Sequence, residues 1–198
     1  MKILKTEYLI KTGEFSRSKE FESILTEIYE AIHSITWPED SKKFTLYPVK
    51  KASGVVPIKK NFVKSLEKNG WKSEYRMKIA SRLRPGPIDS VKFLPGNRYF
   101  AVEWETGNIS SSHRAINKMA IGLLDGFIEG GILILPSRNM YQYLTDRIGN
   151  FAEIEPYFNV WKNLKISKGL LAVIEIEHDD LSEDVPPIRK GTDGRALK

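Results

Sequence analysis

The sequence predicts an α/β protein in which a central mixed β-sheet is flanked by helices on both sides. Two observations indicate this class: several segments have the apolar character of strands, and amphipathic helical segments alternate with them. The chain has 198 residues, 41% of them hydrophobic, which is enough for one domain with its own core. We therefore expect a single domain over residues 1–198.

The predicted sheet contains four strands, at residues 88–94, 98–105, 131–136 and 170–176. The first two form a hairpin, because Pro95-Gly96-Asn97 between them is a turn sequence. The last two are continuous apolar runs, which are typical of strands buried on both faces.

The segments before the hairpin are less regular. Residues 1–17 show little periodicity and are interpreted as an extended or short helical lead-in. Residues 44–47 are strand-like, and residues 71–75 begin another extended segment.

Apolar residues at three- and four-residue spacing predict a long helix that begins at the N-cap residue Ser18 and ends at Trp37-Pro38. Another helix begins at Asn108, a second N-cap residue, and follows directly on the hairpin. The remaining helices are expected at residues 58–68, 139–146 and 151–158.

Composition limits the possible functions. The net charge is +6 and the pI is near 9.3, which fits a polyanionic partner such as nucleic acid. The absence of cysteine excludes disulfides and thiolate metal sites. The three histidines, His33, His113 and His178, lack zinc-ligand spacing.

The sequence has no sign of membrane targeting. Residues 1–5 lack the continuous apolar core of a signal peptide, and no apolar run reaches the roughly 18 residues of a membrane span. We expect a soluble, cytoplasmic protein without a membrane partner.

Three carboxylates follow the hairpin arms. Glu103 and Glu105 project from one face of the second strand, because side chains alternate along a strand. The hairpin brings Asp89 of the first strand beside them. Three carboxylates in one place suit a hard cation such as Mg²⁺, although a Glu-x-Glu pair is also typical of a solvated strand face.

The helix that begins at Asn108 follows these carboxylates at once. Helix N-termini attract phosphate, and Arg114 and Lys118 lie four residues apart on one side of this helix. On their own, two such cations are more often a solvated helix face than a base-reading pair.

Seven stretches of the chain resemble the family of type II restriction endonucleases typified by BamHI and OkrAI. In chain order they are TWPEDSKKFT (36–45), GVVPIK (54–59), PGPID (85–89), VEWETGNISSSHRAINK (102–118), YLTDRIGNF (143–151), EPYF (155–158) and PIRKGTDG (187–194). The run from Glu103 to Lys118 is the most specific, because Glu-aromatic-Glu-Thr-Gly-Asn-Ile-Ser-Ser is not a general metal motif.

The resemblance implies a restriction-endonuclease-like fold, Mg²⁺ as cofactor and no organic cofactor. Asp89 and Glu103 match the metal-binding carboxylates, and Glu74 matches a further carboxylate at the metal site. Glu105 matches the glutamate that replaces the lysine of the wider PD-(D/E)xK superfamily. A carboxylate can accept a proton, so Glu105 is the expected general base.

The resemblance also implies contacts with double-stranded DNA. The matching positions are Lys59, Asn108, Ser110, Arg114, Asp146, Arg147, Asp193 and Gly194. Lys59 is expected near the phosphates, and Asp193 and Gly194 belong to a mobile tail, residues 185–198, that reaches the minor groove. The other five are expected to read base edges in the major groove, where Arg suits guanine, Asn suits adenine and Asp suits cytosine.

The implied activity is Mg²⁺-dependent cleavage of the palindrome GGATCC to leave 5′ GATC overhangs. Relaxed RGATCY or GATC-centred specificity, and a non-cleaving sequence-specific DNA-binding protein, are the alternatives. A palindrome read by one module per half-site requires a homodimer. Its interface is expected to be more apolar than in BamHI, since Leu124, Asn159 and Trp161 occupy positions where ion pairs occur there.

Overall fold

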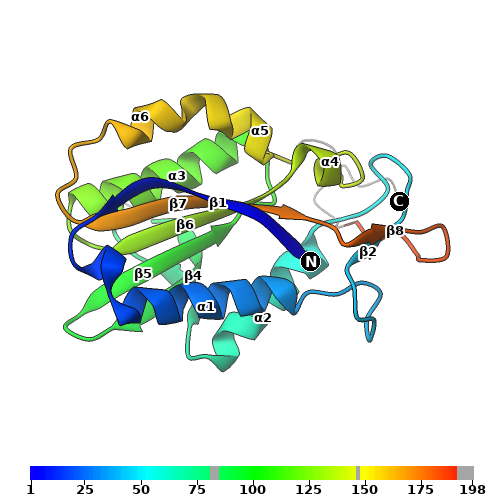
Figure 1. Cartoon of the computed structure of the whole chain (residues 1–198), viewed down its shortest axis with the longest axis horizontal. Helices are drawn as coiled ribbons and strands as arrows, with labels where there is room; N and C mark the ends of the chain where they lie inside the picture. The colour runs from blue at the N-terminus through cyan, green and yellow to red at the C-terminus, as the bar shows by residue number, and fades with distance from the viewer. Residues whose placement is uncertain (81–84, 146–147, 191–198) are drawn as a thin grey trace.

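The computed structural model describes residues 1–80, 85–145 and 148–190, and its centre is a six-stranded sheet (Figure 1). The strands lie in the order β1-β7-β6-β5-β4-β3, with a separate pair formed by β2 and β8. Their bounds are β1 Lys2–Thr12, β2 Thr45–Leu46, β3 Lys72–Arg76, β4 Pro87–Leu94, β5 Arg98–Trp104, β6 Gly130–Pro136, β7 Gly169–Glu177 and β8 Asp180–Leu181. The expected mixed sheet is confirmed, because β5, β6 and β7 are parallel while β1, β3 and β4 pair antiparallel with their neighbours.

Helices cover both faces of the sheet, as expected (Figure 1). On one face lie α1 (Lys19–His33) and α2 (Val56–Lys68), and on the other lie α3 (Ile109–Leu124), α5 (Phe151–Ile154) and α6 (Phe158–Lys162). The short helix α4 (Arg138–Tyr141) follows β6 at the end of the sheet, and the 3₁₀ turns are η1 (Phe15–Arg17) and η2 (Glu155–Tyr157). None of the helices in the described ranges is long and apolar enough to cross a membrane.

Strand β6 shows why two helical layers are needed. All seven of its residues are buried, so neither face of the strand meets solvent. Ile132 and Ile134 belong to the core beneath α1 and α2, whereas Leu133 and Leu135 belong to the core beneath α3. The alternation of side chains along a strand therefore divides one apolar run between two cores.

The local signals in the sequence correctly placed the elements next to the hairpin. The β4–β5 hairpin is antiparallel and turns between Leu94 and Arg98. The Ser18 hydroxyl accepts from the Phe21 N–H, and the Asn108 side chain accepts from the Ser111 N–H, so both predicted N-caps are present.

The extended form expected for the lead-in is confirmed, and this segment is also part of the sheet: β1 is an eleven-residue edge strand beside β7, and its register shifts after Ile3 and after Tyr8. Each shift reverses the side-chain alternation, which explains the missing periodicity. The helix expected over 139–146 ends at Tyr141, because the next carbonyls, of Gln142 and Tyr143, accept N–H groups from the loop at residues 51–53.

The first part of the expected tail is attached to the body of the protein. Trp37 Nε1 donates to the Pro186 carbonyl (2.8 Å), and the Gly54 N–H donates to the Ile188 carbonyl (2.8 Å). Ile188 is 1% exposed, and a Cβ at Gly54 would collide with the Arg189 carbonyl oxygen. Asp193 and Gly194 lie outside the described residues, so their predicted DNA contacts stay predictions.

Candidate active site

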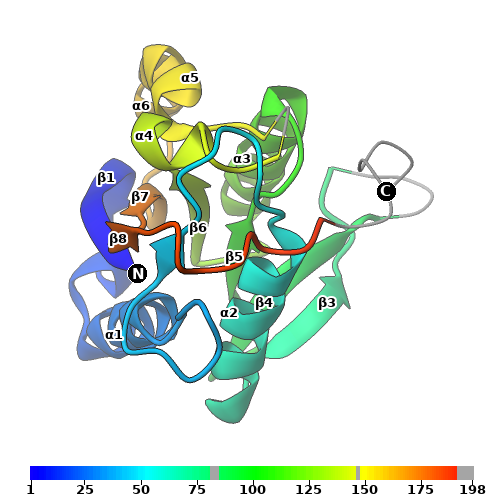
Figure 2. The same ribbon diagram turned by 90° about the vertical axis from the view of Figure 1, so that its right-hand side faces the viewer.

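A cavity of about 740 Å³ lies at the carboxyl end of β5. Figure 2 faces this edge of the sheet, where α2, β4, β5 and α3 lie side by side. The cavity is lined by Lys59, Ile79, Ala80, Gly86, Pro87, Asp89, Glu103, Trp104, Glu105, Ser111, Arg114, Ala115, Asn117, Lys118 and Ile121. The three carboxylates that the sequence singled out therefore share one space.

Asp89 and Glu103 are held by each other's strands. The Asp89 N–H donates to Glu103 Oε2 (3.2 Å), and the Trp104 N–H donates to Asp89 Oδ2 (2.9 Å). Asp89 and Glu103 each lie one residue beyond the last pair of the β4–β5 ladder, Ser90 and Val102. The N–H groups of Asp89 and Trp104 are therefore available to bind the two carboxylates. Asp89 is 6% and Glu103 is 8% exposed, so the hairpin orients two buried carboxylates through its own backbone N–H groups.

Two lysines neutralise this pair. Lys59 Nζ of α2 lies 2.5 Å from Asp89 Oδ1. Lys118 Nζ of α3 lies 3.3 Å from Glu103 Oε1 and donates to the Pro87 carbonyl (2.9 Å). One cation thus comes from each helical layer.

The electrostatics of the site are dominated by burial. Burial raises the pKa of Glu103 to about 7, repulsion by Asp89 adds to the effect, and Lys118 opposes it. Burial also raises the pKa of Glu105, although a hydrogen bond from the Gly107 N–H opposes the rise. Burial lowers the pKa of Lys59, but the ion pair and hydrogen bond with Asp89, together with the charges of Glu103 and Glu74, outweigh burial, and the net change is upward.

Glu105 folds back onto the turn that follows β5. Its Oε1 accepts from the Gly107 N–H (2.5 Å), and a Cβ at Gly107 would lie 2.9 Å from the same oxygen and from Ser111 Oγ. Only glycine leaves room for this arrangement. A half-buried carboxylate with a raised pKa, facing a cavity, is suited to accepting a proton.

Glu74 lies beside the cavity and not among its lining residues. On β3 it stands opposite Asp89, between the paired residues Ser73–Ser90 and Tyr75–Ile88, and it is exposed. Its charge contributes to the raised pKa of Lys59, so it belongs to the same electrostatic environment. Its role as a metal ligand stays a prediction.

The donor set fits a divalent cation, although the residues placed by the structure form no ready-made metal cluster. Among the residues that the structure describes, no three His, Cys, Asp or Glu side chains are grouped closely enough to hold a metal ion. Asp89 and Glu103 nevertheless offer buried oxygen ligands, and burial together with repulsion by Asp89 raises the pKa of Glu103, so a divalent cation would favour its charged form. The ammonium groups of Lys59 and Lys118 occupy oxygens that a cation would use.

The residues expected to read bases begin α3. Asn108, Ser110 and Arg114 are all exposed, and Arg114 also lines the cavity. The side-chain oxygen of Asn108, Oδ1, accepts the N-cap hydrogen bond from the Ser111 N–H, which leaves the side-chain NH₂ group available. Asp146 and Arg147 lie outside the described residues.

The chain that follows Arg147 is fixed to the start of α3. The Gly149 N–H donates to the Gly107 carbonyl (2.8 Å), and the Gly149 Cα faces Ser112 and Ile109. Ser112 Oγ is buried, without a hydrogen-bond partner among the described residues. Gly149 was not predicted as a site residue, since a close approach between distant parts of the chain leaves no local pattern in the sequence.

Lys118 was also missed as a site residue. The solvated-face interpretation is wrong for it, because its side chain is 15% exposed and bound to Glu103. Its four-residue spacing from Arg114 was the available signal, since both residues line the cavity.

The expected dimer positions divide into two groups. Leu124 and Asn159 are exposed. Trp161 is 3% exposed and donates from Nε1 to Asn117 Oδ1 (2.8 Å). It packs α6 against α3, so its side chain serves the core of the chain and not an interface.

Comparison with known proteins gives the same picture over the whole chain. The model of the family described as "Restriction endonuclease BamHI" matches residues 1–195. The type II restriction enzyme OkrAI of Oceanobacter kriegii is 51% identical over 198 residues, 100% of both chains. The type II restriction enzyme BamHI of Bacillus amyloliquefaciens is 36% identical over 190 residues, covering 92% of this chain and 87% of BamHI.

The fold also resembles solved structures of BglII. The structure of restriction endonuclease BglII complexed with a DNA 16-mer has a TM-score of 0.66 at 13% identity, covering 90% of this chain and 79% of that chain. Free BglII has a TM-score of 0.52 at 12% identity, covering 90% of this chain and 81% of that chain. At these identities the similarity concerns the fold alone.

The mixed sheet and the strong matches to named restriction enzymes define the class as type II restriction endonuclease. More particularly, the chain belongs to the restriction endonuclease BamHI family.

The contact at Gly149 predicts a rescue experiment. Gly149→Ala forces a methyl group against Ser112 Oγ and should cost about 1–3 kcal/mol of unfolding free energy. For a chain of this size the melting temperature then falls by about 2–4 °C per kcal/mol. Adding Ser112→Ala removes the obstructing oxygen and should restore most of the loss; equal melting temperatures for the single and double variants would contradict this contact.

The pKa of Glu103 predicts a pH dependence in chelator. A carboxyl with a raised pKa holds its proton more tightly when folded, so between its ordinary 4.5 and about 7 the folded chain binds more protons. The Glu103 contribution to the free energy of unfolding therefore falls as pH rises through this window. Urea unfolding in EDTA at both ends of the window should show a smaller fall for Glu103→Gln than for wild type, and identical profiles would refute the assignment.

Proposed function

We propose that this protein is a Mg²⁺-dependent deoxyribonuclease that cleaves double-stranded DNA at GGATCC and leaves 5′ GATC overhangs. One observation carries the proposal: Asp89, Glu103 and Glu105 share a cavity with Arg114 of the helix that follows them. The printed names of its relatives, type II restriction enzymes OkrAI and BamHI, support a site-specific nuclease. The net charge of +6 supports a polyanionic substrate.

The carboxylates suit phosphodiester hydrolysis. Asp89 and Glu103 would hold Mg²⁺, which when bound polarises the phosphoryl oxygen and stabilises the charge that develops on the leaving oxygen. Glu105 takes the proton of the attacking water. Its pKa is raised towards neutral pH, and a general base works best when its pKa lies near the pH of the reaction. Lys59, which lines the same cavity, offers a positive charge for the phosphate.

Recognition would be carried by the start of α3 and the segment fixed to it. A guanidinium at Arg114 can donate to both O6 and N7 of guanine, and the free NH₂ of Asn108 can donate to a base acceptor. Asp146 and Arg147 would add a carboxylate for cytosine and a second guanidinium for guanine. Two residues separate Glu105 from Asn108, so the reading groups are rigidly placed relative to the general base.

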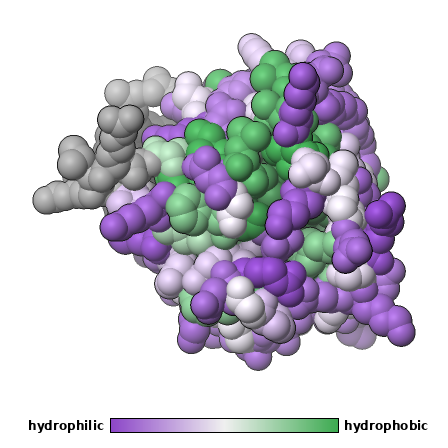
Figure 3. Space-filling model, turned by 90° about the vertical axis from the view of Figure 1, so that its left-hand side faces the viewer, coloured by the Kyte–Doolittle hydropathy of each residue, from purple (hydrophilic) through white to green (hydrophobic). Residues whose placement is uncertain are grey.

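A palindromic site requires a homodimer, and exposed apolar side chains support one. Leu124, Phe127, Tyr157 and Val160 are between 45% and 62% exposed, and they lie at the end of α3, in the loop after it and around α6. Figure 3 shows apolar surface on the end of the molecule remote from the cavity, where α3 ends. The proposal includes a cytoplasmic location, where the DNA substrate would be met.

Digestion tests the proposed activity directly. Phage DNA incubated with the protein and Mg²⁺ should give discrete fragments whose sequenced ends begin 5′ GATC within GGATCC, and EDTA should abolish cutting. Ends from RGATCY would indicate the relaxed alternative, and binding to the site without cutting would indicate the DNA-binding alternative. Discrete fragments without GATC ends would refute the proposal.

Glu105 is expected to be the general base. Glu105→Gln keeps the shape of the side chain but cannot accept the proton, so cleavage should fall by about 10²–10⁴-fold. Binding of a GGATCC duplex in EDTA, measured by fluorescence anisotropy, should change little. Glu30→Gln, at an exposed position of α1, is the matched control; cleavage by the Glu105 variant at the rate of this control would exclude the role.

A further inference from the structure

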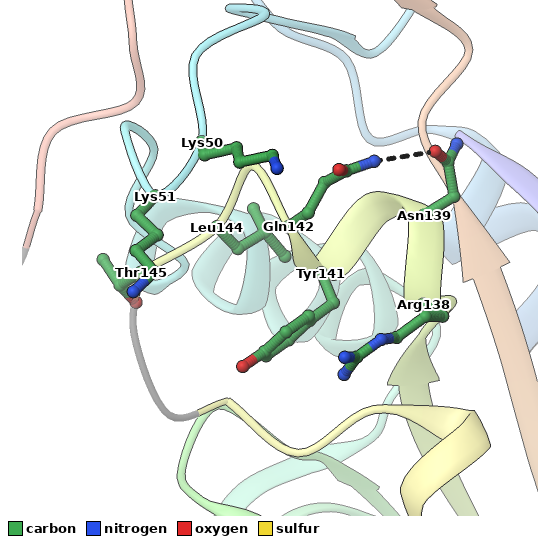
Figure 4. A pocket seen from close by; sticks show the side chains of 8 residues that line it. All are labelled: Lys50, Lys51, Arg138, Asn139, Tyr141, Gln142, Leu144 and Thr145. Atoms are coloured by element: carbon green, nitrogen blue, oxygen red, sulfur yellow. Dashed lines mark hydrogen bonds between the residues drawn. The ribbon is translucent and has the colours of Figure 1, made fainter.

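We propose that a second cavity of about 500 Å³ binds the phosphodiester backbone of DNA, at a distance from the bond that is cut. Its lining consists of Lys50, Lys51, Arg138, Asn139, Tyr141, Gln142, Leu144 and Thr145 (Figure 4). None of these residues belongs to the carboxylate cavity. The inference rests on the proposed function, since it presumes that the protein acts on DNA.

The chemistry of the lining is that of a phosphate site. Three cations come from two separate segments, and none of the described lining residues is acidic. Neutral polar groups also line it: the hydroxyl of Thr145 and the amides of Asn139 and Gln142. Gln142 Nε2 donates to Asn139 Oδ1 (3.0 Å) and Asn139 Nδ2 donates to Glu177 Oε2 (3.1 Å), so each NH₂ group keeps one hydrogen for a ligand. Phosphate oxygens accept from such mixtures of cationic and neutral donors, which fix the position of a duplex without reading its sequence.

The cavity is built by hydrogen bonds between its two walls. The Lys51 N–H donates to the Gln142 carbonyl (2.8 Å), and the Ser53 N–H donates to the Tyr143 carbonyl (3.0 Å). These are the bonds that end α4 early. The loop that carries Lys50 is therefore attached to the segment that carries Arg138, and the cations converge on one space.

Arg138 is oriented before any ligand arrives. Its guanidinium lies 5.0 Å from the centre of the Tyr141 ring, and Figure 4 shows the two side chains next to each other. Its ion pair with Glu153 is 3.7 Å long, and the two side chains are 66% and 39% exposed. An exposed pair of this length is weak, so Arg138 can exchange Glu153 for a phosphate.

The second cavity lies at the same edge of the sheet as the first. Trp104 of β5 pairs in parallel with Ile134 of β6, so Glu105 and the start of α4 both follow the carboxyl ends of adjacent strands. The loop after Lys51 leads directly into α2, which carries Lys59 to Asp89. In Figure 2 this loop and α4 face the viewer together with α2 and α3.

The position in the chain explains what the cavity would contribute. Thr145, on its rim, directly precedes Asp146 and Arg147, the two proposed base readers beyond α3. A phosphate held at Lys50 and Arg138 would therefore fix the duplex backbone next to the bases that are read. Such a contact contributes affinity equally for every DNA sequence.

The salt dependence of binding tests the assignment. Affinity for a GGATCC duplex and for an unrelated duplex is measured in EDTA, from about 50 to about 200 mM salt, for wild type, Lys50→Gln, Arg138→Gln and the double variant. The slope of log K against log salt should decrease in magnitude by about 0.9 for each lost phosphate contact. The weakening should be the same for both duplexes.

A matched control separates a local contact from a general loss of charge. Lys165→Gln/Lys168→Gln removes the same charge just before β7, at the opposite edge of the parallel strands, and should leave the slope unchanged. A double variant at the cavity that keeps the wild-type slope, or matches this control, would overturn the proposal. A loss confined to the GGATCC duplex would overturn it too, because it would mean base contacts.

The proposed function fails by a different result. Wild-type protein that neither cuts GGATCC DNA nor binds it more tightly than unrelated DNA would refute that function. A wild-type enzyme that cuts normally, with unaltered salt slopes for the cavity variants, would refute only the backbone site.

Discussion

Asp89 and Glu103 each accept an N–H from the strand that carries the other, and the rest of the site depends on this exchange. The exchange uses backbone groups at the point where the β4–β5 ladder ends. It holds two carboxylates away from water, where a negative charge is costly unless a cation lies beside it. The lysines from α2 and α3 meet that need in the folded chain. The hairpin thus determines where both helices must deliver positive charge.

This arrangement makes the carboxylate pair sensitive to what binds nearby. Removing the partner of a buried charge is strongly destabilising, so whatever displaces either lysine must itself bring positive charge. Burial raises the pKa of Glu103 even with Lys118 beside it. A cation that binds this pair in the folded chain would therefore raise the free energy of unfolding.

The sequence predicted the parts of the fold and site that depend on short-range chemistry. Each of three features can be recognised from a few consecutive residues: the Asn108 cap, the hairpin turn and the buried run of β6. The same hairpin was enough to predict that Asp89, Glu103 and Glu105 would meet. Strand β1 was not recognised as part of the sheet, because its bulges break the alternation on which recognition depends.

The missed site residues depend on contacts between distant parts of the chain. Nothing near Lys118 in the sequence indicates that Glu103 is its partner, and nothing near Gly149 indicates that Ser112 leaves no room for a methyl group. The early end of α4 is of the same kind, since its carbonyls bond to a loop some ninety residues earlier in the chain. Local sequence patterns predict which charged residues belong to the site, whereas their partners depend on tertiary contacts between residues that are far apart in the chain.

The turn at Gly107 sets a rule for anyone who wishes to redesign this protein. Two side-chain oxygens crowd it: a Cβ at Gly107 would lie 2.9 Å from Glu105 Oε1 and from Ser111 Oγ, and the Gly107 carbonyl accepts the Gly149 N–H. A library that varies the exposed positions of α3 can explore new surfaces without touching this turn. A side chain at Gly107 would instead shift the Glu105 carboxylate or the Ser111 hydroxyl, so a surface change and a change to the proposed base can be made separately.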